Sequence, residues 1–261
     1  MPRVGPVSHE DRLTLVEHLD ELRTRLIVSL VILSVVFALC FWQNHLILDV
    51  INKPLPDGRD HPITFGVAEP FTTTVTVSAY AAILISMPLI LYQLYAFVLP
   101  AFKPHERKVA LPLLMLIPVL FIAGVVFGYF VVLPAAIKFL LNFNTDQFNI
   151  QVRAKDYYSF VSMTLIAMGL VFQVPVGILA ITKLGITTPE QLAKNRRYAW
   201  VIIAVVAAAL PGTDPVSMLL EMVPLLLLFE GSLVLARILG RPRETAAPAP
   251  ESPPGPSGET A

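Results

Sequence analysis

Four long stretches of the chain contain no Asp, Glu, Lys or Arg, and each is 23 to 33 residues long. An α-helix needs about 20 apolar residues to cross the roughly 30 Å hydrocarbon layer of a bilayer. Each stretch is therefore long enough to span a membrane. The four predicted spans lie at about 26–46, 71–96, 109–133 and 157–182. The polar, proline-rich segment 47–70 between the first two is predicted to form an ordered cap outside the membrane.

Two further apolar segments follow, and both are expected to be short. The first, 198–213, should end as a helix before Pro211-Gly212, which leaves about 13 residues or about 20 Å. The second, 216–236, contains Glu221 and Glu230. The fold class predicted is thus an all-α polytopic integral membrane protein with six transmembrane helices, the last two short.

Lysine and arginine are unevenly distributed over the loops that this topology creates. With both termini in the cytoplasm, 14 Lys and Arg residues fall on the cytoplasmic side and 5 on the other. Cytoplasmic loops of membrane proteins carry such an excess. The bias predicts an even number of spans with the N-terminus and the C-terminus both cytoplasmic.

Outside the spans, the chain divides by composition. Ser8-His9-Glu10-Asp11 fits a capping box, and leucines at spacings of three and four follow it on one helical face. An amphipathic interfacial helix is predicted from this pattern. The tail has six prolines in twenty residues, a composition typical of disorder. The predicted organisation is 1–8 disordered, 9–25 interfacial helix, 26–240 transmembrane domain and 241–261 disordered.

Composition removes several classes of function. The chain is 55% hydrophobic and 15% charged with zero net charge, so no nucleic-acid partner is predicted. It has no phosphate-binding Gly-rich loop. His105-Glu106 could begin an HExxH zinc motif, but position 109 is valine. A single cysteine, Cys40, cannot form an intramolecular disulfide. No enzyme activity, metal or cofactor is predicted.

Four acids lie in unusual places, and each has two interpretations. Glu21 could simply pair with Arg25 one helical turn later. Glu106 could be a solvated loop charge, and Asp214 an N-cap of the last helix. Glu221 lies within a span, where an acid is a candidate for function because burial without a partner is costly. In a thin membrane it would instead lie close to the surface.

A series of short motifs resembles TatC, the multi-spanning subunit of the twin-arginine protein translocase. The match runs in order over about residues 15–237, and its order together with six spans is specific. The motifs are His18-Leu19-Asp20-Glu21-Leu22-Arg23-Thr24-Arg25, Pro54-Leu55, Glu69-Pro70-Phe71, Pro88-Leu89-Ile90-Leu91-Tyr92-Gln93, Phe97-Val98-Leu99-Pro100-Ala101-Phe102, Lys103-Pro104-His105-Glu106-Arg107, Gly128-Tyr129-Phe130, Phe172-Gln173-Val174-Pro175, Arg196-Arg197-Tyr198, Pro211-Gly212-Thr213-Asp214-Pro215 and Phe229-Glu230.

This resemblance implies a core receptor subunit that binds twin-arginine signal peptides at its cytoplasmic face. It implies that Glu21 and Glu106 hold the two arginines, and a carboxylate can indeed accept a guanidinium in bidentate fashion. Supporting residues implied at the same site are Arg23, Phe97, Pro100 and Pro54. With single-span partner subunits, such a protein exports folded proteins using the proton-motive force. The alternative function is a secondary transporter of a small solute.

The resemblance also implies partners. TatA-like and TatB-like single-span subunits, further copies of the chain and the lipid bilayer are expected, in a bacterial cytoplasmic (inner) membrane. The family often has a glutamate where this chain has Gln173, and a glutamine where it has Met218. Glu221 lies three residues further on the same helix face and could replace the polar contact. The residues predicted for partner docking and intramembrane polarity are Gln173, Asp214, Met218 and Glu221.

Overall fold

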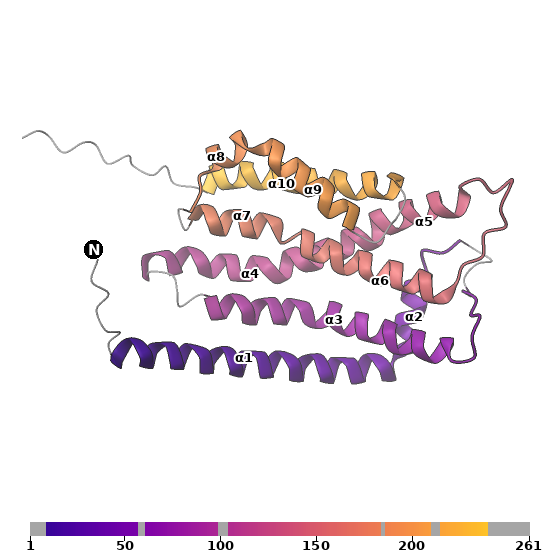
Figure 1. Cartoon of the computed structure of the whole chain (residues 1–261), viewed down its shortest axis with the longest axis horizontal. Helices are drawn as coiled ribbons and strands as arrows, with labels where there is room; N and C mark the ends of the chain where they lie inside the picture. The colour runs from indigo at the N-terminus through magenta and orange to yellow at the C-terminus, as the bar shows by residue number, and fades with distance from the viewer. Residues whose placement is uncertain (1–8, 57–60, 99–103, 184–185, 210–214, 240–261) are drawn as a thin grey trace, which may run out of the picture.

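The structure is a computed structural model, and it describes residues 9–56, 61–98, 104–183, 186–209 and 215–239. At helix positions 9–17, 98, 104–114, 183, 217, 220 and 239 it describes the backbone alone. The two tails predicted to be disordered, 1–8 and 241–261, lie outside these residues. The described part of the chain is an all-helical bundle (Figure 1). Its elements are α1 His9–Trp42, α2 Asn44–Asn52, α3 Glu69–Val98, α4 Pro104–Phe127, η2 Gly128–Val132, α5 Leu133–Asn142, α6 Ala154–Val171, α7 Val174–Lys183, α8 Pro189–Lys194, α9 Arg196–Ala209 and α10 Pro215–Leu239.

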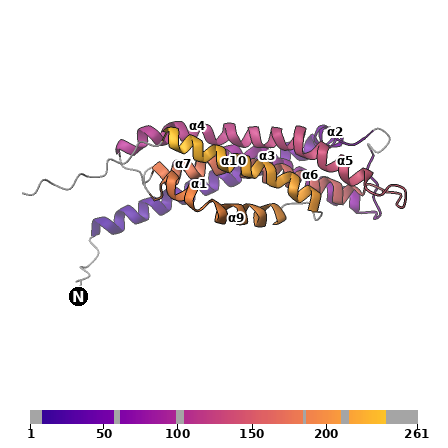
Figure 2. The ribbon, with the colours of Figure 1, turned by 90° about the horizontal axis from the view of Figure 1, so that it is seen from above.

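Four stretches of helix in the described residues are long and apolar enough to cross a membrane. They are His18–Trp42, Glu69–Phe97, Met115–Asn142 and Ala154–Thr182, and each contains or overlaps one of the four long spans predicted from charge-free runs. Figure 1 shows them lying side by side along the length of the molecule. Figure 2 shows the bundle from above, with α4 along one side and α9 on the opposite side.

The third span is longer than predicted, because the helix does not stop at residue 133. It passes through one π-helical turn, η2, and continues as α5 to Asn142. The amide of Leu133 donates to the carbonyl of Gly128, five residues earlier. Pro134 follows at once, and a proline ring would clash with the preceding turn of a regular α-helix. The widened turn accommodates this proline without ending the helix.

At the start of the chain, α1 crosses the predicted boundary at residue 26 without a break. It is 34 residues long, or about 51 Å. The segment predicted as an interfacial helix, 9–25, is therefore the first part of one continuous rod. Its interfacial position remains a prediction.

The last two helices differ in length. α9 has 14 residues, about 21 Å, as expected for a short segment. α10 has 25 residues, about 37 Å, so the prediction of a short last helix is wrong. Apolar residues surround Glu221 and Glu230 in sequence, and the helix tolerates the internal Pro224.

The helices pack in a defined set of neighbouring pairs. α1 lies against α3, α3 against α4 and α6, and α10 against α7 and α9. α4 and α6 approach closely because two glycines face each other's helices. A Cβ on Gly124 would lie 2.6 Å from the carbonyl oxygen of Met168, and one on Gly169 would lie 2.6 Å from the Phe121 ring. A methyl group at either position would force the helices apart.

The bundle has two distinct ends (Figure 1). We call the end with the start of α1, the end of α3 and the start of α4 the N-terminal end. The opposite end, the cap end, holds α2 and the described loop residues 61–68 and 143–153. Buried Tyr157 fastens α2 there, since its hydroxyl donates to the carbonyl of Ile51 at 2.6 Å. Tyr129 donates likewise to Val50 at 2.6 Å. The described part of the predicted cap segment is packed against the bundle, and its position outside the membrane stays a prediction.

Candidate functional site

The sequence-predicted acid of the N-terminal end, Glu21, already binds a guanidinium. Its Oε1 accepts two hydrogen bonds from Arg25, from Nε at 3.0 Å and from Nη2 at 2.6 Å. The two residues lie one turn apart on α1, so the ion pair considered from the sequence does form. The side chain of Glu21 keeps 36% of its surface exposed and that of Arg25 keeps 25%.

The end of α3 completes this arrangement. The Nη1 atom of Arg25 donates to Oε1 of Gln93 at 3.0 Å, which ties α1 to α3. His18, one turn before Glu21, places Nδ1 3.8 Å from Glu21 Oε2. The His18 ring also stacks on Phe97, with centroids 4.2 Å apart and planes 11° from parallel. Phe97, which the sequence predicts as a supporting residue of this site, thus packs against α1.

An open groove runs beside the Glu21–Arg25 pair. Its volume is about 410 Å³, and it is lined by Asp20, Glu21, Thr24, Arg25, Val28 and Gln93. Charged and amide groups line one part, and Thr24 and Val28 line the rest.

The remaining residues predicted for this site have different outcomes. Arg23 lies on α1 with an exposed side chain. Glu106 belongs to the first turn of α4, at the same end of the bundle, where the backbone alone is described. Pro100 lies outside the described residues. The supporting role predicted for Pro54 is wrong, because Pro54 follows α2 at the cap end (Figure 1). Since α1 carries the chain from one end of the bundle to the other, Pro54 cannot support a site around Glu21.

Of the residues predicted for polar contacts inside the membrane, Gln173 lies in the turn before α7, and Met218 and Glu221 lie on α10. Gln173 occupies the break between α6 and α7, where Pro175 supplies no backbone donor. Its Nε2 donates to the carbonyls of Ile117 at 3.3 Å and Gly169 at 3.4 Å. Glu221 is 1% exposed. Met218 packs with the apolar cluster shared by α7, α9 and α10. Asp214 lies outside the described residues.

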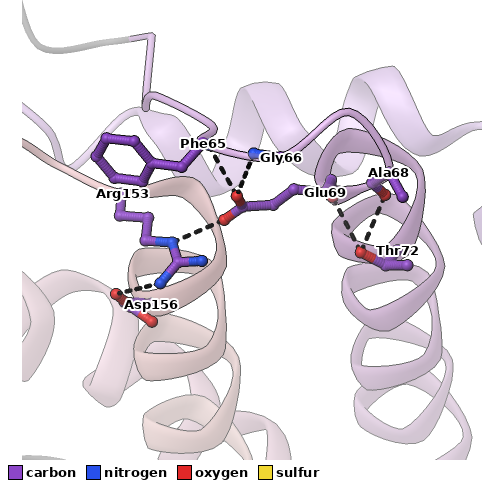
Figure 3. A network of polar contacts seen from close by, with 7 residues as sticks. All are labelled: Phe65, Gly66, Ala68, Glu69, Thr72, Arg153 and Asp156. Carbon is purple, nitrogen blue, oxygen red and sulfur yellow. Dashed lines mark hydrogen bonds and ion pairs between the residues drawn. The ribbon is translucent and has the colours of Figure 1, made fainter.

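A second charged site, at the cap end, was not predicted as a site. Glu69, at the start of α3, is only 8% exposed and accepts hydrogen bonds from the amides of Phe65 at 2.8 Å and Gly66 at 3.1 Å. Its other oxygen accepts from Nε of Arg153 at 2.8 Å (Figure 3). Arg153 lies under the Phe65 ring, 5.6 Å from its centroid.

This second site joins two loops that are far apart in the sequence. The amide of Ile63 donates to the carbonyl of Val152, and the amide of Ala154 donates to that of Ile63, both at 2.8 Å. Asp156 adds a longer contact to Arg153, at 4.0 Å. The hydrogen bond to Glu69 raises the pKa of Arg153 further above its already high value. One sequence signal could have pointed to this pair. Glu69 and Arg153 each lie just before a predicted span, and both of those spans begin at the cap end of the bundle.

Comparison with known proteins places the chain in a family. A family model described as "Sec-independent protein translocase protein (TatC)" matches residues 17–224. The chain belongs to the TatC family. TatC of Carboxydothermus hydrogenoformans is 36% identical over 90% of this chain and 97% of its own length. TatC of Escherichia coli strain K12 is 38% identical over 91% of this chain and 95% of its own length.

A solved TatC structure has the same fold. The crystal structure described as "Twin Arginine Translocase Receptor- TatC in DDM" aligns with a TM-score of 0.75 and 34% identity, over 84% of this chain and 99% of that one. TatC membership decides between the two functions considered from the sequence in favour of protein translocation.

Among the described residues, no three His, Cys, Asp or Glu side chains are grouped so that they could hold a metal ion.

Proposed function

We propose that this TatC protein is the receptor subunit that binds twin-arginine signal peptides, with Glu21 and Glu106 as the two arginine-binding acids. The observation that carries the proposal is the contact at Glu21. There a partly exposed carboxylate beside an open groove is already shaped to accept a guanidinium. Planar guanidinium groups with several donors suit such a site, whereas a lysine ammonium presents one compact charge.

The N-terminal end of the bundle faces the cytoplasm in this proposal, with both termini on that side. The excess of lysine and arginine on the loops of this end supports that orientation. α9 and α10 then act as the fifth and sixth spans, and the short α9 would be matched by a locally thinned membrane. The protein sits in the bacterial cytoplasmic membrane and uses the proton-motive force.

Partner subunits are proposed to dock in the region of α7, α9 and α10. TatA-like and TatB-like single-span helices would contact Gln173, Asp214, Met218 and Glu221, and further copies of the chain complete a receptor complex. The partly buried amide of Gln173 at a helix break supports a polar function there. Acids and amides inside a membrane are costly unless they serve such a contact.

Site-specific crosslinking tests the signal-peptide site. A photoreactive peptide with paired arginines is added to membranes that contain the wild-type protein, Glu21→Gln or Glu106→Gln. Each substitution should reduce crosslinking at least about tenfold, because the charge-assisted bonds to arginine are lost. Glu190→Gln, an exposed residue on α8, is the matched control for the loss of one negative charge. Unchanged crosslinking in both site variants would refute the assignment.

A further inference from the structure

Glu21 is not an empty receptor for arginine, because the chain's own Arg25 occupies it. Two of the five N–H groups of the Arg25 guanidinium point at a single oxygen, Glu21 Oε1, at 3.0 and 2.6 Å. These are charge-assisted bonds of the kind that an arginine from a peptide would make. A peptide arginine and Arg25 therefore need the same acceptor.

Arg25 is held in this place from a second helix. Its Nη1 donates to Gln93 Oε1 on α3 at 3.0 Å. Gln93 is an acceptor 68 residues away in sequence, and it contacts a part of the guanidinium that Glu21 does not use. The two acceptors together surround one planar guanidinium. Gln93 thus favours the arrangement in which Arg25 stays on Glu21.

We propose that Arg25 is a resident occupant of the arginine-binding site and that Gln93 stabilises it there. This inference rests on the proposed function, since it concerns regulation of the same site. A signal-peptide arginine binds Glu21 only in the fraction of molecules in which Arg25 has moved away. In the peptide-bound state one guanidinium has replaced another, so the carboxylate again has a cationic partner.

A resident competitor has a defined effect on affinity. It multiplies the apparent dissociation constant of every ligand of Glu21 by the same factor, the inverse of the fraction of free sites. Twin-arginine and twin-lysine peptides are therefore weakened equally, and their ratio is unchanged. The weaker peptide is driven below useful binding at cellular concentrations. Arg25 acts as a threshold against poor ligands.

The size of the factor follows from the exposure of the pair. Glu21 and Arg25 are both partly exposed, and ion pairs of this type are worth little in water. The site should then be free in roughly one molecule in three to six. Removal of Arg25 should tighten peptide binding by about three- to sixfold.

The test measures the affinity of fluorescent twin-arginine and twin-lysine peptides for the full-length protein in lipid nanodiscs at fixed low ionic strength. Arg25→Gln should tighten both peptides by the same factor, and Arg25→Lys should tighten them less. Gln93→Leu changes no charge and should tighten both peptides about twofold, because Arg25 loses its second acceptor. Arg197→Gln removes one positive charge from α9 and should leave both affinities unchanged.

Double variants separate this inference from the proposed function. Arg25→Gln should have no effect on residual binding in a Glu21→Gln background, and Gln93→Leu should add nothing to Arg25→Gln. Unchanged or weaker binding in both Arg25→Gln and Gln93→Leu, with binding still lost in Glu21→Gln, overturns the resident-occupant proposal and leaves the function intact. Unchanged binding in Glu21→Gln overturns the site itself. Thermal melting of each variant in nanodiscs confirms that the proteins compared are folded.

Discussion

The two ends of the bundle each contain an arginine–carboxylate pair, and the two pairs are built differently. At the N-terminal end, Glu21 and Arg25 are four residues apart on one helix and both are partly exposed. At the cap end, Glu69 and Arg153 are 84 residues apart, and Glu69 is 8% exposed with two additional backbone donors. Distances to the carboxylate are alike, from 2.6 to 3.0 Å.

The difference shows that bond length does not reveal what an ion pair does. The Glu21 pair can open at little cost, since water replaces the partners and the helix does not depend on the contact. Opening the Glu69 pair would leave a carboxylate that is only 8% exposed without its cation and would loosen the link between two loops. One pair is suited to exchange its partner and the other to fix the cap. Stability and binding measurements on the two ends test this contrast.

The largest expected effect is on the cap end. Glu69→Ala removes the acceptor for the amides of Phe65 and Gly66 and for Arg153, and should lower the melting temperature in detergent by about 5 °C. Glu69→Gln keeps an oxygen acceptor and should lower it less. Hydrogen exchange of the Ile63 and Ala154 amides should quicken in Glu69→Ala. A melting temperature equal to that of the wild type would place the Glu69 pair in the same class as the Glu21 pair.

An intermediate effect is expected for the tyrosines that fasten α2. Tyr157→Phe removes the donor to the Ile51 carbonyl, which is buried, and should cost about 1 kcal/mol or about 3 °C. Tyr129→Phe removes an equally short bond to the Val50 carbonyl in a more exposed position, and it should cost less because water can replace the donor. The comparison of the two melting curves checks this order. Equal losses would show that exposure does not control the cost at the cap end.

Added salt should affect peptide binding at the N-terminal end and leave the stability of the cap end nearly unchanged. Peptide binding at Glu21 should weaken by about threefold as the Debye length shrinks from about 30 Å to about 8 Å, because the site is open to solvent. The melting temperature, which depends on the buried carboxylate of Glu69 and its backbone donors, should change little over the same range. Titrations and melts in the same buffers measure both. A salt-independent affinity would contradict the view that the Glu21 groove is solvated.

The smallest effect is predicted for the stability of Arg25→Gln. An exposed pair one turn apart on a helix contributes a few tenths of a kcal/mol, so the melting temperature should fall by no more than about 1 °C. The same variant should nevertheless tighten peptide binding. A large loss of stability would mean that the link from Arg25 to Gln93 holds α1 against α3. The arginine–carboxylate pairs at both ends of the bundle would then be structural.

Much of the fold was predictable because it depends on local composition. The four long spans follow from charge-free runs, and the short α9 follows from Pro211. The pair of Glu21 and Arg25 was also readable, since residues four apart on a helix must be neighbours. The continuation of the third span to Asn142 was missed because 134–156 was assigned as a whole to a polar segment, although its polar residues begin only at Lys138 and Asn142.

Features that depend on long-range contacts could not be read from the sequence. Nothing local to Glu69 indicates that its partner is Arg153, and nothing local to Arg25 indicates Gln93. Pro54 was assigned to the wrong end because a motif match gives chain order and no position in space. Glu21 was found through the family's motif, while its occupancy by Arg25 required both helices to be placed together.

The π turn at Gly128–Val132 has a consequence for the phase of the third span. Each extra residue in a helix rotates everything after it by about 100° about the axis. Relative to an uninterrupted α-helix, the chain therefore carries a surplus of one residue here, and α5 is turned accordingly. Leu133, Ile137 and Leu141 meet Ile51 and Leu55 of the cap because of that rotation. A single-residue surplus thus sets which side of the rod's second half meets the cap.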